Sequence, residues 1–225
     1  MIRKNIKSML LVLVFSIFFG MLSQELYNVY NQPVIVSAAN KSKQAGSAFA
    51  KAITAGKISY KAATGGLPYE KGDFALVDDL DGDGVKELVI VHHKQSLPSF
   101  TVWKYAKGKV SKLASWNKAA ALTESFGWGC YLLYDKKNKV FWCIGEAHGG
   151  WMIGYQLAGK KVKEKVCYSA YLASSGKFKV HKIVNGKSTE TSMKKYEALR
   201  EDILKNGTIP TMSKTKLIQK LKNMK

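Results

Sequence analysis

Apolar residues follow two different periods along this chain, and the first is helical. Between residues 42 and 55 they recur at the spacing of one buried helix face. Ser42 is a suitable N-cap and Gly56 a suitable C-terminal stop, so the pattern predicts a helix over 42–55. The stripe consists of Ala45, Ala48, Phe49, Ala52 and Ile53.

From residue 73 to residue 190 the period changes to short alternating segments separated by turn residues. Asn185-Gly186 is the strongest hairpin signal. Hairpins in series are typical of an antiparallel meander, not of βαβ units. Grouped in pairs, they give two four-stranded, blade-like units and one remaining hairpin. The expected strands cover 74–78, 87–93, 100–105, 109–113, 129–134, 139–145, 151–157, 161–168 and 177–184.

The last part of the chain returns to helical spacing. One stripe includes Tyr196 and Ile203 and predicts a helix over 192–205, and a second includes Leu221 and predicts a helix over 213–223. The expected fold class is mainly β (α+β): an antiparallel β-meander over 73–190, with one N-terminal and two C-terminal helices. Residues 40–225 are expected to form a single domain.

Residues 1–39 have the features of an export signal. Arg3, Lys4 and Lys7 precede an apolar run over residues 9–22, and Ser37-Ala38-Ala39 offers a small-residue cleavage site. The run is shorter than the ~20 residues of a usual membrane span. We therefore expect a signal peptide, with an uncleaved N-terminal anchor as the alternative. Either one places the protein outside the cell, secreted or surface-anchored, with membrane contact only through an uncleaved N-terminal segment.

The 225 residues carry a formal net charge of +20, almost entirely from lysine, because arginine occurs only at Arg3 and Arg200. Specific nucleic-acid recognition favours arginine, which contacts bases and phosphates with two hydrogen bonds. The composition therefore argues against a specific nucleic-acid partner. It is typical of a solvated lysine surface, and weak attraction to an anionic wall polymer or membrane is the alternative.

Three cysteines in an exported chain leave one without an intramolecular partner. If residues 135–138 form a turn, Tyr134 faces Lys139 and Cys130 faces Cys143. Facing residues of an antiparallel pair are close enough for a disulfide. A Cys130–Cys143 disulfide is therefore one hypothesis, with Cys167 free, and three small buried thiols are the other.

The most specific chemical signal is an acidic loop at residues 79–84. Asp79, Asp81 and Asp83 alternate with residues that include Gly82, and Gly84 follows. Calcium binds several oxygen ligands at ~2.3–2.6 Å, and carboxylates at alternate positions of a tight turn can converge on one ion. Glycines let the chain curl at little steric cost. The loop predicts a calcium site, against the alternative of a solvated Asp-Gly turn.

Two later residues extend the predicted ligand set: Val85 would add a backbone carbonyl, and Glu87 would close the shell directly or through water. An EF-hand would need a glutamate at the twelfth loop position, where this chain has Ile90. Its flanks would also be helices, whereas here they have strand patterns.

Residues 74–90 instead resemble the strand–loop–strand calcium motif of FG-GAP/VCBS repeats, as in the integrin alpha propeller. The motif is also similar to one in uncharacterised secreted proteins of Clostridia-type bacteria. The resemblance implies calcium bound between two strands of a blade. It assigns the metal ligands to Asp79, Asp81, Asp83, the Val85 carbonyl and Glu87. Family members usually carry several such loops, whereas this chain carries one.

A second candidate site lies at Glu146 and His148, which alternate on one face of an extended segment. A glutamate–histidine pair can perform acid–base chemistry or bind metal. Trp151 and Trp128 are the candidates to stack on a sugar there, and a polar turn is the alternative. His92 and His93 point to opposite faces of a strand and are interpreted as structural.

These observations favour an exported, non-catalytic calcium-binding β module that binds a cell-surface polymer, glycan or protein. The alternatives are a secreted hydrolase that uses Glu146 and His148, and a lysine-driven binder of anionic wall polymer or membrane. Short hydrolase signatures such as G-x-S-x-G and H-E-x-x-H do not occur in the sequence.

Overall fold

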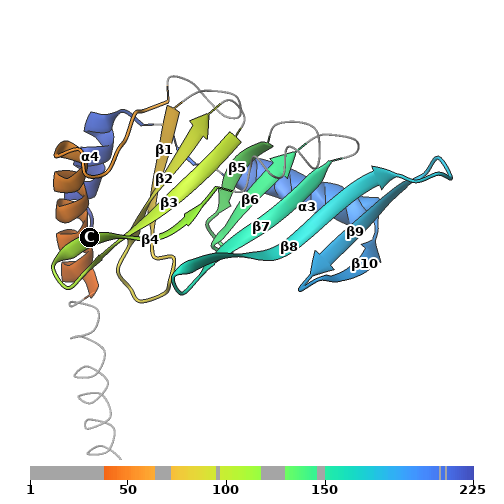
Figure 1. Cartoon of the computed structure of the whole chain (residues 1–225), viewed down its shortest axis with the longest axis horizontal. Helices are drawn as coiled ribbons and strands as arrows, with labels where there is room; N and C mark the ends of the chain where they lie inside the picture. The colour runs from red at the N-terminus through yellow and green to blue at the C-terminus, as the bar shows by residue number, and fades with distance from the viewer. Residues whose placement is uncertain are drawn as a thin grey trace, which may run out of the picture.

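The computed structural model describes residues 38–63, 72–94, 97–117, 130–145, 150–207, 209–210 and 212–225. The strands in these ranges form two antiparallel sheets in which sequence neighbours are also spatial neighbours (Figure 1). The first sheet, in the order β1-β2-β3-β4, contains β1 (Gly72–Asp78), β2 (Glu87–Lys94), β3 (Leu97–Ala106) and β4 (Lys109–Trp116). The second, in the order β10-β9-β8-β7-β6-β5, contains β5 (Cys130–Asp135), β6 (Val140–Gly145), β7 (Trp151–Ala158), β8 (Lys161–Leu172), β9 (Phe178–Val184) and β10 (Lys187–Thr191).

The predicted fold class is confirmed, and one detail of the grouping is wrong. The first four strands form the expected four-stranded unit. The last hairpin does not stand apart, because β9 pairs with β8, with Ala170 opposite Val180. The second sheet therefore has six strands. At its end, Asn185 and Gly186 both have positive φ, 51° and 75°, as a tight two-residue hairpin turn requires.

Two helices follow the strands, as predicted: α3 (Met193–Asn206) and α4 (Lys214–Lys222). Ser192 caps α3 by accepting a hydrogen bond from the Lys195 amide, and Ser213 caps α4 in the same way. Serine at this position satisfies an amide that has no partner inside the helix.

The N-terminal helix covers residues 38–54 in the part that the structure describes. It was predicted over 42–55, with Ser42 as its cap. That assignment is wrong, because Ser42 lies inside the helix and is buried. Its hydroxyl donates to the Gly84 carbonyl of the acidic loop at 3.3 Å.

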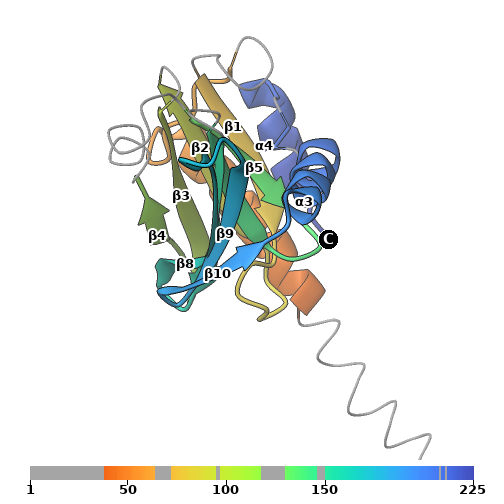
Figure 2. The same cartoon turned by 90° about the vertical axis from the view of Figure 1, so that its right-hand side faces the viewer.

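The buried side chains form three clusters, which separate four layers (Figures 1 and 2). The N-terminal helix and α4 cover one face of the first sheet, where Leu221 and Ile90 share a cluster. The other face meets the second sheet, and Phe100 stacks on Phe141 at 4.4 Å between ring centroids. Helix α3 covers the far face of the second sheet, where Ile203 is buried.

Strand β2 shows why these layers follow from the sequence. Val89 and Val91 face the second sheet, whereas Leu88 and Ile90 face the helices. A strand buried on both faces has an unbroken apolar run, because neither side contacts water. The loop between β1 and β2 is thereby held at the edge of two hydrophobic clusters.

The β5–β6 hairpin corrects the predicted cysteine register. Its turn covers residues 136–139, not 135–138, and Cys143 faces Leu132 while Cys130 faces Gly145. Asp135 accepts hydrogen bonds from the Asn138 amide and side chain, at 3.1 and 2.7 Å, which lengthens the strand by one residue.

Diagonal neighbours on one face of a sheet remain within contact reach. The Sγ atoms of Cys130 and Cys143 accordingly lie 3.0 Å apart with no bond between them in this structure, and all three cysteines are buried. Burial, followed by the contact with Cys130, raises the pKa of the Cys143 thiol. Burial likewise raises the pKa of Cys167 to about 11. The Cys130–Cys143 disulfide stays a prediction.

Candidate metal centre

The acidic loop connects the ends of β1 and β2, where Asp78 and Glu87 face each other. Gly82 and Gly84 have φ of 79° and 81°, so the chain curls through left-handed conformations that glycine adopts without strain. Leu80 is buried between the two sheets. This side chain anchors the loop while its polar residues remain at the surface.

The loop carboxylates are oriented by the loop's own backbone. Asp79 accepts hydrogen bonds from the amides of Gly82 and Gly84, at 2.8 and 3.2 Å. Asp83 accepts from the amide of Val85 at 2.9 Å. Each bond fixes one face of a carboxylate, which directs its remaining lone pairs away from the backbone.

Glu87 is the deepest of these acidic residues, with a fully buried side chain. Its Oε2 atom accepts a hydrogen bond from the Leu80 amide at 2.9 Å. Its Oε1 atom makes no hydrogen bond within the described part of the chain. Burial raises the pKa of Glu87 to about 7, although the Leu80 hydrogen bond acts in the opposite direction. A buried carboxylate oxygen without a hydrogen bond carries a large desolvation cost that a cation would offset.

Asp79, Asp81 and Glu87 each offer one carboxylate oxygen within 4.8 Å of the others. Two calcium ligands on opposite sides of one ion are separated by about 5 Å, because each lies ~2.3–2.6 Å from it. The spacing therefore fits three oxygens around a common centre. This cluster can hold a metal ion.

Strand β3 adds a residue that the sequence analysis did not assign to the site, Lys104. Its ammonium forms ion pairs with Asp81 and with Asp83, the latter at 2.7 Å, and lies 3.5 Å from Glu87 Oε1. Burial alone would lower the pKa of Lys104, but the hydrogen bonds to Asp81 and Asp83 outweigh it and raise that pKa. Burial works to raise the pKa of Asp83, and the bonds from Lys104 and the Val85 amide hold it below its ordinary value.

The position of Lys104 follows from strand register. Strand β2 pairs with β3 so that Leu88 faces Trp103, and the same register carried one residue further sets Lys104 opposite Glu87. This register joins residues 17 positions apart (104 − 87 = 17). A local sequence pattern contains no signal for it, because the pairing is set by how the two strands pack.

The five predicted ligands therefore do not all meet at one point. Asp79, Asp81 and Glu87 come together as one group. Asp83 joins them through the shared Lys104 ammonium. Val85 donates its amide to Asp83 and buries its side chain against the helices.

The loop is braced from the second sheet. Tyr134 donates its hydroxyl proton to Asp78 at 2.8 Å, and Lys139 donates to the Asp79 carbonyl. Burial, followed by the bond to Asp78, raises the pKa of Tyr134. Asp78 therefore takes part in the contact between the two sheets.

The two neighbouring histidines have different surroundings. His92 Nδ1 lies 2.7 Å from a carboxylate oxygen of Asp73 on the facing strand. His93 is buried, and its ring meets Phe74 edge-on at 5.3 Å.

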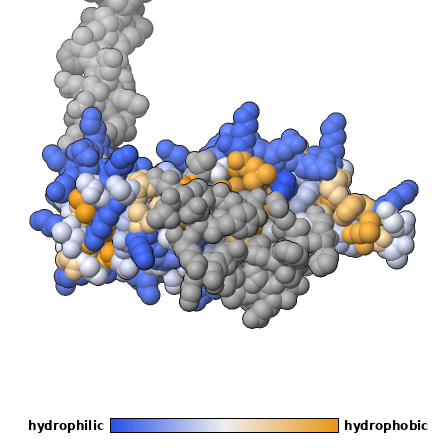
Figure 3. Space-filling view, turned by 90° about the horizontal axis from the view of Figure 1, so that it is seen from above, coloured by the Kyte–Doolittle hydropathy of each residue, from blue (hydrophilic) through white to orange (hydrophobic). Residues whose placement is uncertain are grey.

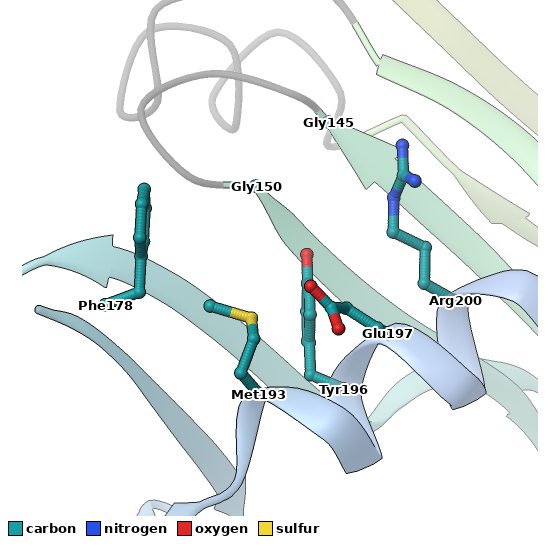
Figure 4. A pocket seen from close by; sticks show the side chains of 7 residues that line it. All are labelled: Gly145, Gly150, Phe178, Met193, Tyr196, Glu197 and Arg200. Atoms are coloured by element: carbon teal, nitrogen blue, oxygen red, sulfur yellow. The ribbon is translucent and has the colours of Figure 1, made fainter.

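The second candidate site, Glu146 and His148, lies outside the described residues, as does Trp128. Nearby, a cavity of about 460 Å³ is lined by side chains from β9 and α3 and by two glycines (Figure 4). Trp151 does not stack on a surface ligand, because it is 1% exposed and packs between the sheets. The lining residues are Gly145, Gly150, Phe178, Met193, Tyr196, Glu197 and Arg200.

Residues 1–37 lie outside the described part of the chain, and so does the predicted export segment except for Ala38 and Ala39. Among the described residues, no helix has the length and apolar character needed to cross a membrane.

Comparison with known proteins gives no family assignment. The chain matches no protein-family model, no curated protein and no solved structure. What the structure defines is a class of molecule: a mainly β protein of two packed sheets with an acidic loop, at the edge of their junction, that could hold a metal ion.

Proposed function

We propose that this chain is an exported, non-catalytic calcium-binding β module. The observation that carries the proposal is the convergence of Asp79, Asp81 and Glu87 within 4.8 Å, with the Glu87 side chain fully buried. Oxygen ligands of this kind suit a hard divalent cation, and an irregular loop suits calcium, which accepts varied geometry, better than magnesium, which demands near-ideal octahedral geometry. The resemblance of residues 74–90 to the FG-GAP/VCBS motif supports the same ion.

Calcium has a structural role in this proposal. The loop contacts the N-terminal helix through Ser42 and the second sheet through Tyr134 and Lys139. An ion that binds only the folded loop therefore stabilises contacts among three parts of the molecule. The exported location rests on the N-terminal apolar segment, and extracellular calcium is abundant enough to fill weak sites.

The proposed partner is a cell-surface polymer, a glycan or another surface protein. The chain has a formal net charge of +20, and hydrophilic residues protrude from the face shown in Figure 3. Such a surface is attracted to anionic polymers of the cell wall.

Thermal unfolding of the full chain with calcium and with chelator tests the metal site. At a calcium concentration one hundred times Kd, binding stabilises the folded state by ~2.7 kcal/mol, which raises Tm by about 5–10 °C for a chain of this size. Asp81→Ala should abolish that rise. Asp135→Ala is the matched control, since it removes an aspartate from another turn and should leave the rise intact. A wild-type Tm that is the same in calcium and in chelator contradicts the proposal.

A further inference from the structure

The acidic loop already contains a cation of the protein's own. The Lys104 ammonium lies among Asp81, Asp83 and Glu87, and its side chain is only 17% exposed. Lysine ammonium groups are strongly hydrated and rarely leave water without a compensating partner. The three carboxylates provide that compensation, so Lys104 neutralises part of the loop's charge.

The ammonium and a divalent ion draw on two of the same carboxylate side chains. Asp81 and Glu87 belong to the group that can hold a metal, and both also contact Lys104. A calcium ion that lies ~2.3–2.6 Å from its ligands leaves no room for an ammonium bonded to the same oxygen lone pairs. A calcium ion and an ammonium that shared these carboxylates would also repel each other, most strongly where water is excluded.

A second, independent observation places the competition inside the cluster. Glu87 is 0% exposed, and its Oε1 atom makes no hydrogen bond in the described part of the chain, with the Lys104 ammonium 3.5 Å away. The lysine therefore satisfies Asp81 and Asp83 well and Glu87 poorly. An ion in direct contact would satisfy Glu87 better, and this difference is the driving force for exchange.

We propose that Lys104 is a resident competitor, so that calcium binds by displacing its ammonium from the loop into solvent. This inference rests on the proposed calcium function and adds its regulation. Displacement lowers calcium affinity, because the lost ion pairs are subtracted from the binding free energy. The loop would consequently stay folded without calcium and respond only to the high concentrations found outside cells.

Calcium titration by isothermal calorimetry on the full chain tests this competition. Lys104→Met removes the competing charge and keeps the length of the side chain. It should tighten calcium binding at least about fivefold, the lower end of usual coupling between ligands. Lys112→Met is the matched control, because it removes one charge from an exposed position on the adjacent strand β4. It should leave Kd within about twofold, since exposed charges are screened.

Two controls separate competition from a loss of folding: the Lys104→Arg variant and melting temperatures measured with chelator and with calcium. Arginine keeps the positive charge, so its Kd should stay near the wild-type value, which separates charge from side-chain shape. In chelator, Lys104→Met should melt below wild type, because the carboxylates then face one another without a cation. In saturating calcium this deficit should disappear. A deficit that persists equally in both conditions indicates only structural damage and overturns the inference.

The outcomes separate the two proposals. If wild type binds calcium and Lys104→Met binds no tighter, the competition is refuted and the calcium function stands. If only Lys104→Met binds, Lys104 does occupy the site, but the wild-type calcium function is refuted. If neither binds, both proposals fall.

Discussion

The junction between the two sheets and the outer end of the second sheet contain similar residues, which are buried at the junction and exposed at the outer end. Every residue of β6, at the junction, is buried, whereas β10, at the outer end, is exposed along nearly its whole length. Phe141 at the junction is 1% exposed, and Phe178 at the outer end is 54% exposed. An aromatic side chain stabilises a fold through the surface it removes from water. The same residue type therefore contributes much more to stability at the junction than at the outer end.

The contrast also explains where the acidic loop can exist. Several close carboxylates repel one another, and a loop that carries them needs support from outside itself. The loop obtains this support at the rim of the junction, from Tyr134, Lys139 and Lys104. The Asn185-Gly186 turn at the outer end needs only its backbone conformation, and its flanking strand is largely exposed.

The largest expected effect comes from Phe141→Ala. Phe141 stacks on Phe100 and packs on Tyr134, so truncation opens a cavity where the two sheets meet. We expect the free energy of unfolding to fall by about 3–5 kcal/mol. Urea denaturation followed by tryptophan fluorescence measures it. A loss below about 1 kcal/mol would mean that the junction is not the stable centre of the fold.

The next effect is a pH dependence at the rim of the junction. The pKa of Glu87 is raised from 4.5 to about 7 in the folded state by burial. The folded chain therefore holds this proton more tightly than the unfolded chain. In chelator, the free energy of unfolding should fall as the pH rises from about 5 to about 8, by ~3 kcal/mol.

Glu87→Gln tests that dependence, because glutamine still accepts the Leu80 hydrogen bond and cannot ionise. The variant should lose this part of the pH dependence in urea denaturation at a series of pH values. Glu201→Gln, at an exposed position of α3, is the control and should follow wild type. Parallel curves for Glu87→Gln and wild type would show that the buried carboxyl is not the group responsible.

The smallest expected effect comes from Phe178→Ala, the counterpart of Phe141→Ala at the outer end. More than half of the Phe178 side chain is already in water, so truncation removes little buried surface. We expect a change of about 0.5 kcal/mol or less in the same urea experiment. A loss that approaches that of Phe141→Ala would erase the contrast between the two regions.

Most of the local structure was predictable. The strand segments, the Asn185-Gly186 turn and the two capped C-terminal helices depend on neighbours within a few residues, and such signals are present in the sequence itself. One error arose where a helix boundary was judged from local signals alone. Ser42 looked like a cap, yet it lies inside the helix, and its hydroxyl donates to the Gly84 carbonyl of the acidic loop instead.

The residues of the candidate site also fall into those that the sequence predicts and those that it does not. Asp79, Asp81 and Glu87 were predictable as a group, because a short curled loop brings together residues that are near in sequence. Lys104 was not, because its place depends on the register of β2 against β3. The Cys130 and Cys143 register was wrong by one turn residue, since the Asp135–Asn138 contacts decided where the β5 strand ended.

The sequence by itself determined the hairpins, the helices and an acidic loop with calcium-type spacing, because backbone propensity, turn chemistry and hydrophobic period act over short distances. Only the tertiary structure decided that the last hairpin extends the second sheet, that Trp151 is buried and that Lys104 neutralises the loop. These outcomes depend on which surfaces pack together. Packing is a property of the whole chain, since each strand face is buried only when its partner layer is in place.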